Sequence, residues 1–190
     1  SLRCESNRLS SLDISKNTLL TILHCGGNQL TSIDITNNTE LTDFNCSNNL
    51  LTEIDISKNS ELKYFSIHGN NLTNIDVSKN SNIHELACSE NKLTDLDVSM
   101  CTKLNKLWCD YNQLSELDIS NNPLLTYLDC SSNILINLKV NNNVYLEYLL
   151  CRQNELTSLD LSQNLMLNQS DCIDNVYNII LIGNKSDLTT

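Results

Sequence analysis

The sequence is poor in the residues that usually make turns, with only 4 Gly and 1 Pro among 190 residues. Aromatic side chains make up 5% of the chain, and the 12 basic residues are outnumbered by 23 acidic ones. The net charge of -11 disfavours nucleic acid and anionic membrane surfaces, because both are bound by clustered Lys and Arg. No apolar run approaches the ~20 residues that span a bilayer. We therefore expect no nucleic-acid partner and no membrane insertion.

Asparagine takes the place of the missing Gly and Pro, and it recurs with a fixed step of 21 residues. It suits a repeated turn, because Asn tolerates left-handed backbone geometry and bonds to its own nearby backbone. A second Asn column has the same step and is interrupted once, by Cys101. The first column is Asn7, Asn28, Asn49, Asn70, Asn91, Asn112, Asn133, Asn154 and Asn175, and the second is Asn17, Asn38, Asn59, Asn80, Asn122, Asn143 and Asn164.

Each 21-residue unit reads LxxLxCxxNxLxxLDxSxNxx, with apolar residues exchanging for one another. The unit is too short for a packed pair of helices, and each half contains a two-residue alternation that is typical of a strand. Strands of successive units would pair in parallel about 4.8 Å apart. The repeat therefore predicts a solenoid of about nine coils, with a curved parallel sheet on the concave side, an irregular convex side and little α-helix.

The whole chain, residues 1–190, is expected to form one domain built from these coils. Solenoid ends need polar caps to stay soluble, yet Ser1 and Leu2 begin in the middle of a unit. Near the other end the pattern weakens, because Ser170 stands where earlier units have a core Leu. We therefore expect a segment of a longer protein, and we expect this segment to be a monomer.

Eight of the nine cysteines fall in one column of the repeat, where Ile67 stands at the one remaining position. A column of metal ligands or disulfides would not accept Ile, whereas a core column would, since Cys often behaves as a small buried hydrophobe. Zinc sites also need closely spaced Cys pairs or His partners. We predict structural free thiols, with disulfides or a metal as the alternatives. The eight are Cys4, Cys25, Cys46, Cys88, Cys109, Cys130, Cys151 and Cys172.

An Asp column marks the second half of the unit and is followed two residues later by Ser or Thr. Short polar side chains of this kind bond to nearby backbone and hydroxyl groups, so we expect a structural role on the convex side. A calcium site is the alternative, although a single column is a poor source of the about six to eight oxygens that calcium needs. The column is Asp13, Asp34, Asp55, Asp76, Asp97, Asp118 and Asp160.

The first half of the unit varies most between coils, and it carries the only Trp and most of the Tyr residues. Strand positions that alternate with the buried Leu and Cys should face the concave surface. Aromatics with a polar rim are typical of a recognition site, but they can also simply cover a sheet. Lys106 is expected to lie against the ring of Tyr127. The predicted site, named the concave patch, comprises Tyr64, Lys106, Trp108, Asp110, Tyr111, Tyr127, Asp129, Tyr148, Leu150 and Arg152.

The sequence offers little that suggests catalysis. The three histidines, His24, His68 and His84, occupy different columns of the repeat. The chain has no nucleophile elbow, phosphate-binding loop or HExxH motif. A solenoid also offers no deep, dry pocket of the kind that catalysis uses. We predict that the segment is not an enzyme and that it carries no cofactor.

The two halves of each unit both read LxxLx(L/C)xxN, and this nested pattern resembles the 21-residue IRREKO class of bacterial leucine-rich repeats. The cysteine column is similar to the cysteine ladder found among the internalins. The resemblance covers essentially the whole chain and implies a protein secreted from a bacterial cell or exposed on its surface. It implies a recognition or adhesion module that binds a protein, or a glycan, on its concave face. The alternative is a structural spacer that holds another domain away from the surface.

Overall fold

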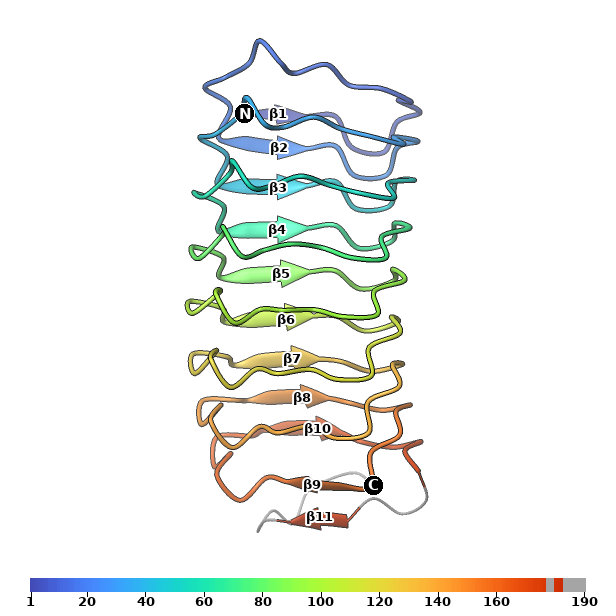
Figure 1. The fold of residues 1–190 in the computed structure, drawn as a ribbon, viewed down its shortest axis with the longest axis vertical. Coiled ribbons are helices and arrows are strands. Elements are labelled where there is room, and N and C mark those ends of the chain that lie inside the picture. Colours follow the sequence, from blue (N-terminus) through green and yellow to red (C-terminus); the bar gives the residue numbers. More distant parts are fainter. Residues whose placement is uncertain (177–179, 183–190) are drawn as a thin grey trace.

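The structure, a computed structural model, describes residues 1–176 and the backbone of residues 180–182. The chain winds into a solenoid whose coils stack along one axis, as Figure 1 shows. One strand from each coil joins a nine-stranded parallel sheet, and the described residues contain no α-helix. The predicted solenoid is thereby confirmed. In order across the sheet, the strands are β1 (Leu2–Arg3), β2 (Ile22–His24), β3 (Asp43–Asn45), β4 (Tyr64–Ser66), β5 (Glu85–Ala87), β6 (Lys106–Trp108), β7 (Tyr127–Asp129), β8 (Tyr148–Leu150) and β10 (Gln169–Asp171).

Neighbouring strands pair so that residues 21 apart in the sequence lie side by side. On β6 and β7, for example, Lys106 pairs with Tyr127 and Trp108 with Asp129. In the nine-stranded sheet, the middle residue of each three-residue strand is buried, and the two outer residues are at least partly exposed. Each column of the sequence repeat is therefore a column in space, which confirms the predicted alternation between core and concave surface.

The convex side differs from the prediction at its C-terminal end, where a second, two-stranded parallel sheet forms. In it β9 (Ser158–Asp160) pairs with β11 (Ile180–Ile182). The sequence Ile-Leu-Ile of β11 contains β-branched residues that favour strands, whereas the corresponding segments of earlier coils are irregular. Residues 177–179 and 183–190, at the end of the predicted ninth coil, lie outside the described residues. No helix in the described part of the chain is long and apolar enough to cross a membrane.

The first Asn column ties each coil to the one before it. Asn112 donates from Nδ2 to the carbonyl oxygens of Cys88 in the preceding coil and Cys109 in its own, both at 3.1 Å. Its Oδ1 accepts the backbone N–H of Leu93 at 2.9 Å. The same pattern runs from Asn28 to Asn175. Each buried amide thus satisfies backbone groups that the turn leaves unpaired, as the repeat predicted.

The residue before each of these asparagines has a left-handed backbone. The φ angle is 65° at Gly27, 52° at Glu90 and 51° at Tyr111. Residues other than Gly or Asn pay an energetic penalty of roughly 1 kcal/mol or more in this region. The coil nevertheless keeps the same turn whichever residue occupies it, because the asparagine hydrogen bonds that follow hold the turn closed.

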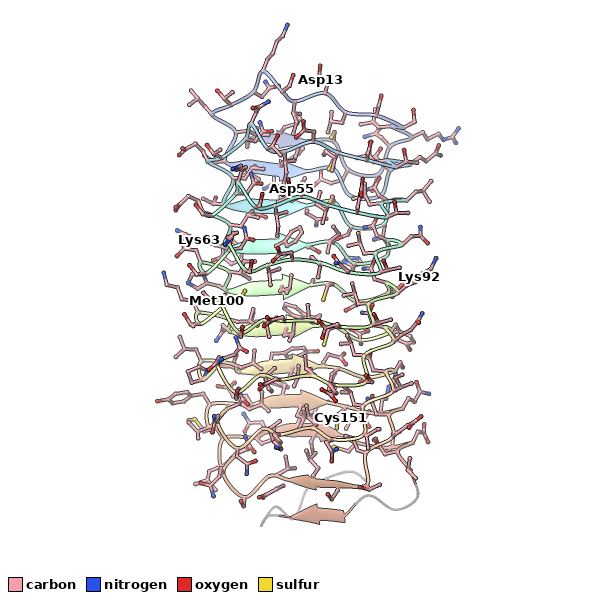
Figure 2. All side chains as sticks on the ribbon, in the orientation of Figure 1. Asp13, Asp55, Lys63, Lys92, Met100 and Cys151 are labelled. Carbon is pink, nitrogen blue, oxygen red and sulfur yellow. The ribbon has the colours of Figure 1, made fainter. Side chains whose placement is uncertain are left out.

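The cysteine column lies inside the stack. All nine cysteines are free thiols, and eight of them are buried, while Cys4 is partly exposed. In Figure 2, Cys151 lies within the coils, whereas Lys92 and Met100 project from two edges. Ile67, which interrupts the column, is fully buried at an equivalent place. The column is therefore a set of core positions that accept a thiol or an aliphatic group of modest size.

Burial also makes these thiols poor nucleophiles. It raises the pKa of Cys25 and of Cys88 to about 12, so almost no thiolate forms at neutral pH. Within the column, thiols from Cys25 to Cys130 point at the next coil; Cys130 Sγ, for example, lies 3.6 Å from the carbonyl oxygen of Leu150. The Cys151 thiol donates a hydrogen bond to the sulfur of Cys172 at 3.1 Å.

Thiol reactivity provides a direct test of the column. In the native chain we expect only Cys4 to react rapidly with iodoacetamide, because the other thiols are buried. Mass spectrometry after timed alkylation would count the modified residues, and Cys4→Ser should remove the rapid step. Rapid modification of several buried thiols, or disulfides in the untreated protein, would contradict this assignment.

The second Asn column makes a similar connection and is weakened at Cys101. Asn80 donates from Nδ2 to the carbonyl oxygens of Ile56 and Asn59 at 3.1 and 2.9 Å. At Cys101 the thiol lies 3.9 and 3.8 Å from the equivalent carbonyl oxygens of Val77 and Asn80. A thiol is a weak donor at these distances, so one step of the column lacks two strong hydrogen bonds.

Cys101→Asn should therefore stabilise the fold. The new amide would donate two hydrogen bonds, but its Oδ1 would lack a protein partner, as it does in Asn80 and Asn122. We expect a net gain of about 1 kcal/mol in the free energy of unfolding, measured by urea denaturation. The matched control is Asn122→Cys, which should lose a similar amount. A destabilised Cys101→Asn would show that local volume outweighs hydrogen bonding in this turn.

Candidate functional site

The centre of the concave patch lies on β6, β7 and β8. Trp108 ends β6, while Tyr127 and Tyr148 begin β7 and β8. The ring centroids of Trp108 and Tyr127 are 5.1 Å apart with planes tilted by 38°, and those of Tyr127 and Tyr148 are 5.9 Å apart with a tilt of 34°. Three aromatic rings therefore form a continuous row across three coils, at separations typical of favourable aromatic pairs.

Lys106 lies at the edge of this row. Its Nζ is 3.1 Å from the carboxylate of Glu85 and 6.0 Å from the ring centre of Trp108. This placement corrects the expectation that Lys106 lies against Tyr127. Glu85 is its direct neighbour on β5, so the ion pair draws the ammonium group away from β7.

Two carboxylates lie beside the aromatic row. Asp129 ends β7 and accepts the backbone N–H of Ser131 at 3.1 Å, and Asp110 accepts a hydrogen bond from the Ser89 hydroxyl. Burial raises the pKa of Asp129; the bonds from Ser131 oppose the rise, the charge of Asp110 adds to it, and Arg152 opposes it. The hydrogen bonds from Ser131 and the charge of Arg152 therefore only partly stabilise the negative charge of Asp129.

The other predicted site residues surround the row or lie apart from it. Tyr64 lies on β4, and its ring centroid is 6.5 Å from that of His84. Tyr111 lies in the turn after β6 and is half exposed. Leu150 ends β8 and is partly exposed, and Arg152 is exposed two residues beyond it. The structure therefore gathers the aromatic row and its rim, and Tyr64, two coils away on β4, lines a hollow of about 210 Å³ together with Trp108.

The sequence reasoning missed a hollow beside the patch. A cavity of about 580 Å³ runs along the turns that lead into the strands, and its lining includes Leu124, Tyr145 and Met166. These three side chains are about half exposed and share one column of the repeat. The four preceding coils have Glu40, Glu61, Asn82 and Lys103 in that column, so the change from polar to apolar residues was a readable signal.

Comparison with solved structures places the chain among known proteins. No protein-family model matches the sequence, and the comparison with curated proteins finds no match. The functional domain of internalin J from Listeria monocytogenes, which includes a cysteine ladder, is 38% identical, with a TM-score of 0.74 over 96% of this chain and 48% of that one. The chain is a leucine-rich-repeat protein.

Other leucine-rich-repeat proteins share the fold at lower identity. One from Leptospira interrogans is 24% identical, with a TM-score of 0.88 over 100% of this chain and 55% of its own. The plant peptide hormone receptor RGFR1, solved in complex with RGF2, is 24% identical, with a TM-score of 0.73 over 85% of this chain and 29% of its own. The chain spans about half the length of the two bacterial proteins.

The Asp column of this leucine-rich-repeat chain makes local bonds on the convex side. Asp76 accepts the backbone N–H of Ser78 at 2.8 Å, and Asp34 accepts both the backbone N–H and the hydroxyl of Thr36, at 2.9 and 2.6 Å. Among residues 1–176 and 180–182, no group of three or more His, Cys, Asp or Glu side chains is placed to hold a metal ion. The column therefore serves the turns themselves.

These bonds predict that acid weakens the fold. Hydrogen bonds from Ser or Thr lower the pKa of Asp76 and of its counterparts in the column. A lowered folded pKa means that the stabilisation is complete above the pKa of an unfolded Asp, about 4, and is lost as pH falls through the folded value. We expect the urea concentration at the midpoint of unfolding to decrease when the pH is lowered below about 4. Asp76→Asn should reduce this dependence, whereas a midpoint that rises on acidification would refute the assignment.

Proposed function

We propose that this leucine-rich-repeat chain is a non-catalytic recognition or adhesion module that binds a protein with its concave patch. The row formed by Trp108, Tyr127 and Tyr148 supports this proposal most strongly. Large aromatic side chains provide contact area at low entropic cost, and the charged residues at the rim can set the orientation of a partner. Three earlier coils have Asn45, Ser66 and Ala87 in the column of Trp108, so the aromatic row is local rather than part of the repeat.

The relatives supply the context for this proposal. RGFR1, which shares the fold, is solved in complex with RGF2. The likeness to the internalin J domain supports a bacterial protein that is secreted or displayed at the cell surface, where a concave recognition face would meet other molecules. A glycan is the alternative ligand, because sugars also stack on aromatic rings.

A structural spacer is the second candidate function. The contacts within the row favour it to some extent, since aromatic pairs are worth about 0.5–1.5 kcal/mol each and can serve simply to cover a sheet. The two functions differ in what the outward faces of the rings do. A spacer needs the rings for stability, whereas a recognition module needs them for its partner.

Trp108→Ala separates the two functions. If the patch binds a partner, the substitution should cost about 2 kcal/mol of binding, or roughly a 30-fold loss of affinity, with little change in folding stability. The chain and its variant would be tested on an array of extracellular proteins and glycans, with affinities measured for each positive. Asp76→Ala, on the convex side, should leave binding intact. A variant that unfolds while its folded fraction still binds would favour the spacer.

A further inference from the structure

We infer that the concave patch holds an arginine side chain of its partner, stacked on Trp108 and paired with the carboxylate of Asp129. This inference rests on the proposed function and names the chemistry that the partner must present. It is carried by the charge balance of the patch, by the position of Asp129 between two apolar neighbours, and by the geometry of the rings.

The charges of the patch do not balance. The ammonium group of Lys106 is already paired with Glu85 at 3.1 Å. Beyond that pair, Asp129 and Asp171 end β7 and β10, and Asp110 lies two residues after the end of β6. Across this part of the concave face their nearby counter-charge is the guanidinium group of the exposed Arg152. A cationic ligand would therefore complement this face, and the net charge of -11 would attract it from a distance.

Asp129 is the carboxylate that lacks compensation most clearly. On the sheet it pairs with Trp108 on one side and with Leu150 on the other. These large neighbours shield it from water, and burial accordingly raises the pKa of Asp129. Beyond the bonds from Ser131 it retains lone pairs that can accept further donors. A cation placed beside it would gain more than it would at an exposed carboxylate, because screening by water is weaker.

The rings explain why arginine fits better than lysine. A planar guanidinium group can stack on an indole face and donate two parallel hydrogen bonds to one carboxylate. Adjacent strands lie about 4.8 Å apart, so the indole of Trp108 and the carboxylate of Asp129 are within reach of one such group. The tilted ring of Tyr127, 5.1 Å from that of Trp108, completes the aromatic surface. A lysine ammonium could use the charge but not the planar geometry.

A peptide titration tests the inference directly. The probes are three short, amidated peptides that differ at one position, which is arginine, lysine or citrulline; citrulline has almost the shape of arginine but no charge. Trp108 is the only Trp in the chain, so its fluorescence reports on the patch without interference. We expect the arginine peptide to perturb this signal at the lowest concentration, the lysine peptide to bind more weakly and the citrulline peptide to bind about ten-fold or more weakly.

Two Asp→Asn variants provide a matched pair, since each removes one negative charge. Asp129→Asn should weaken binding of the arginine peptide about ten-fold while raising the melting temperature, because it neutralises a shielded carboxylate and keeps an oxygen for the Ser131 N–H. Asp76→Asn should leave peptide binding unchanged and lower the melting temperature, since the pKa of Asp76 is lowered in the fold by the bonds from Ser78.

Equal weakening by the two variants would show that overall charge alone attracts the peptide, and it would overturn the inference. Equal binding of the arginine and citrulline peptides would overturn it too. If either result appears while Trp108→Ala abolishes binding of a protein found on the array, the proposed function stands and only the arginine assignment fails. If Trp108→Ala instead binds every partner as tightly as the unchanged chain does, the proposed function is overturned.

Discussion

The hydrogen bonds of the first Asn column are the constraint on which the structure depends. Each amide joins backbone groups of its own coil to backbone groups of the preceding coil, as Asn112 does with Cys109 and Cys88. A buried amide with fewer partners would cost about 1–3 kcal/mol, so a coil with one residue more or less in this part of the unit would be penalised. This requirement keeps the step at 21 residues and aligns every other column.

Once the coils are aligned, other positions are free to vary within limits set by their neighbours. The core position after each strand accepts Cys or, at Ile67, an aliphatic group, because its requirement is a buried apolar side chain of modest size. The left-handed position accepts residues as different as Gly27, Glu90 and Tyr111, because the backbone conformation is imposed by the turn that the asparagine closes. The two outer positions of each strand are the least constrained by packing, and the aromatic row lies at such positions. In such a fold, residues that bind a partner can occupy the columns that are not needed to stack the coils.

The repeat made most of the architecture predictable, because a column of identical residues in a sequence is a column in space. It predicted the parallel sheet, the buried thiols and the concave position of Trp108, Tyr127 and Tyr148. It did not predict the direction in which Lys106 turns, since that depends on a side chain 21 residues earlier, Glu85, competing with the ring of Tyr127. The left-handed column was hidden for a different reason: its residue types vary, so only backbone angles reveal it.

Aspartate shows how the two faces of one coil assign opposite roles to the same residue type. On the convex side, Ser78 donates hydrogen bonds to Asp76, and these bonds lower its pKa, so the charge there supports the fold. On the concave side, Asp129 accepts similar bonds from Ser131, yet burial between Trp108 and Leu150 outweighs them and raises its pKa. A charge retained at a cost to stability needs a reason outside the fold, because Asn could make the same backbone bond more cheaply. The cationic partner group that we propose would supply that reason.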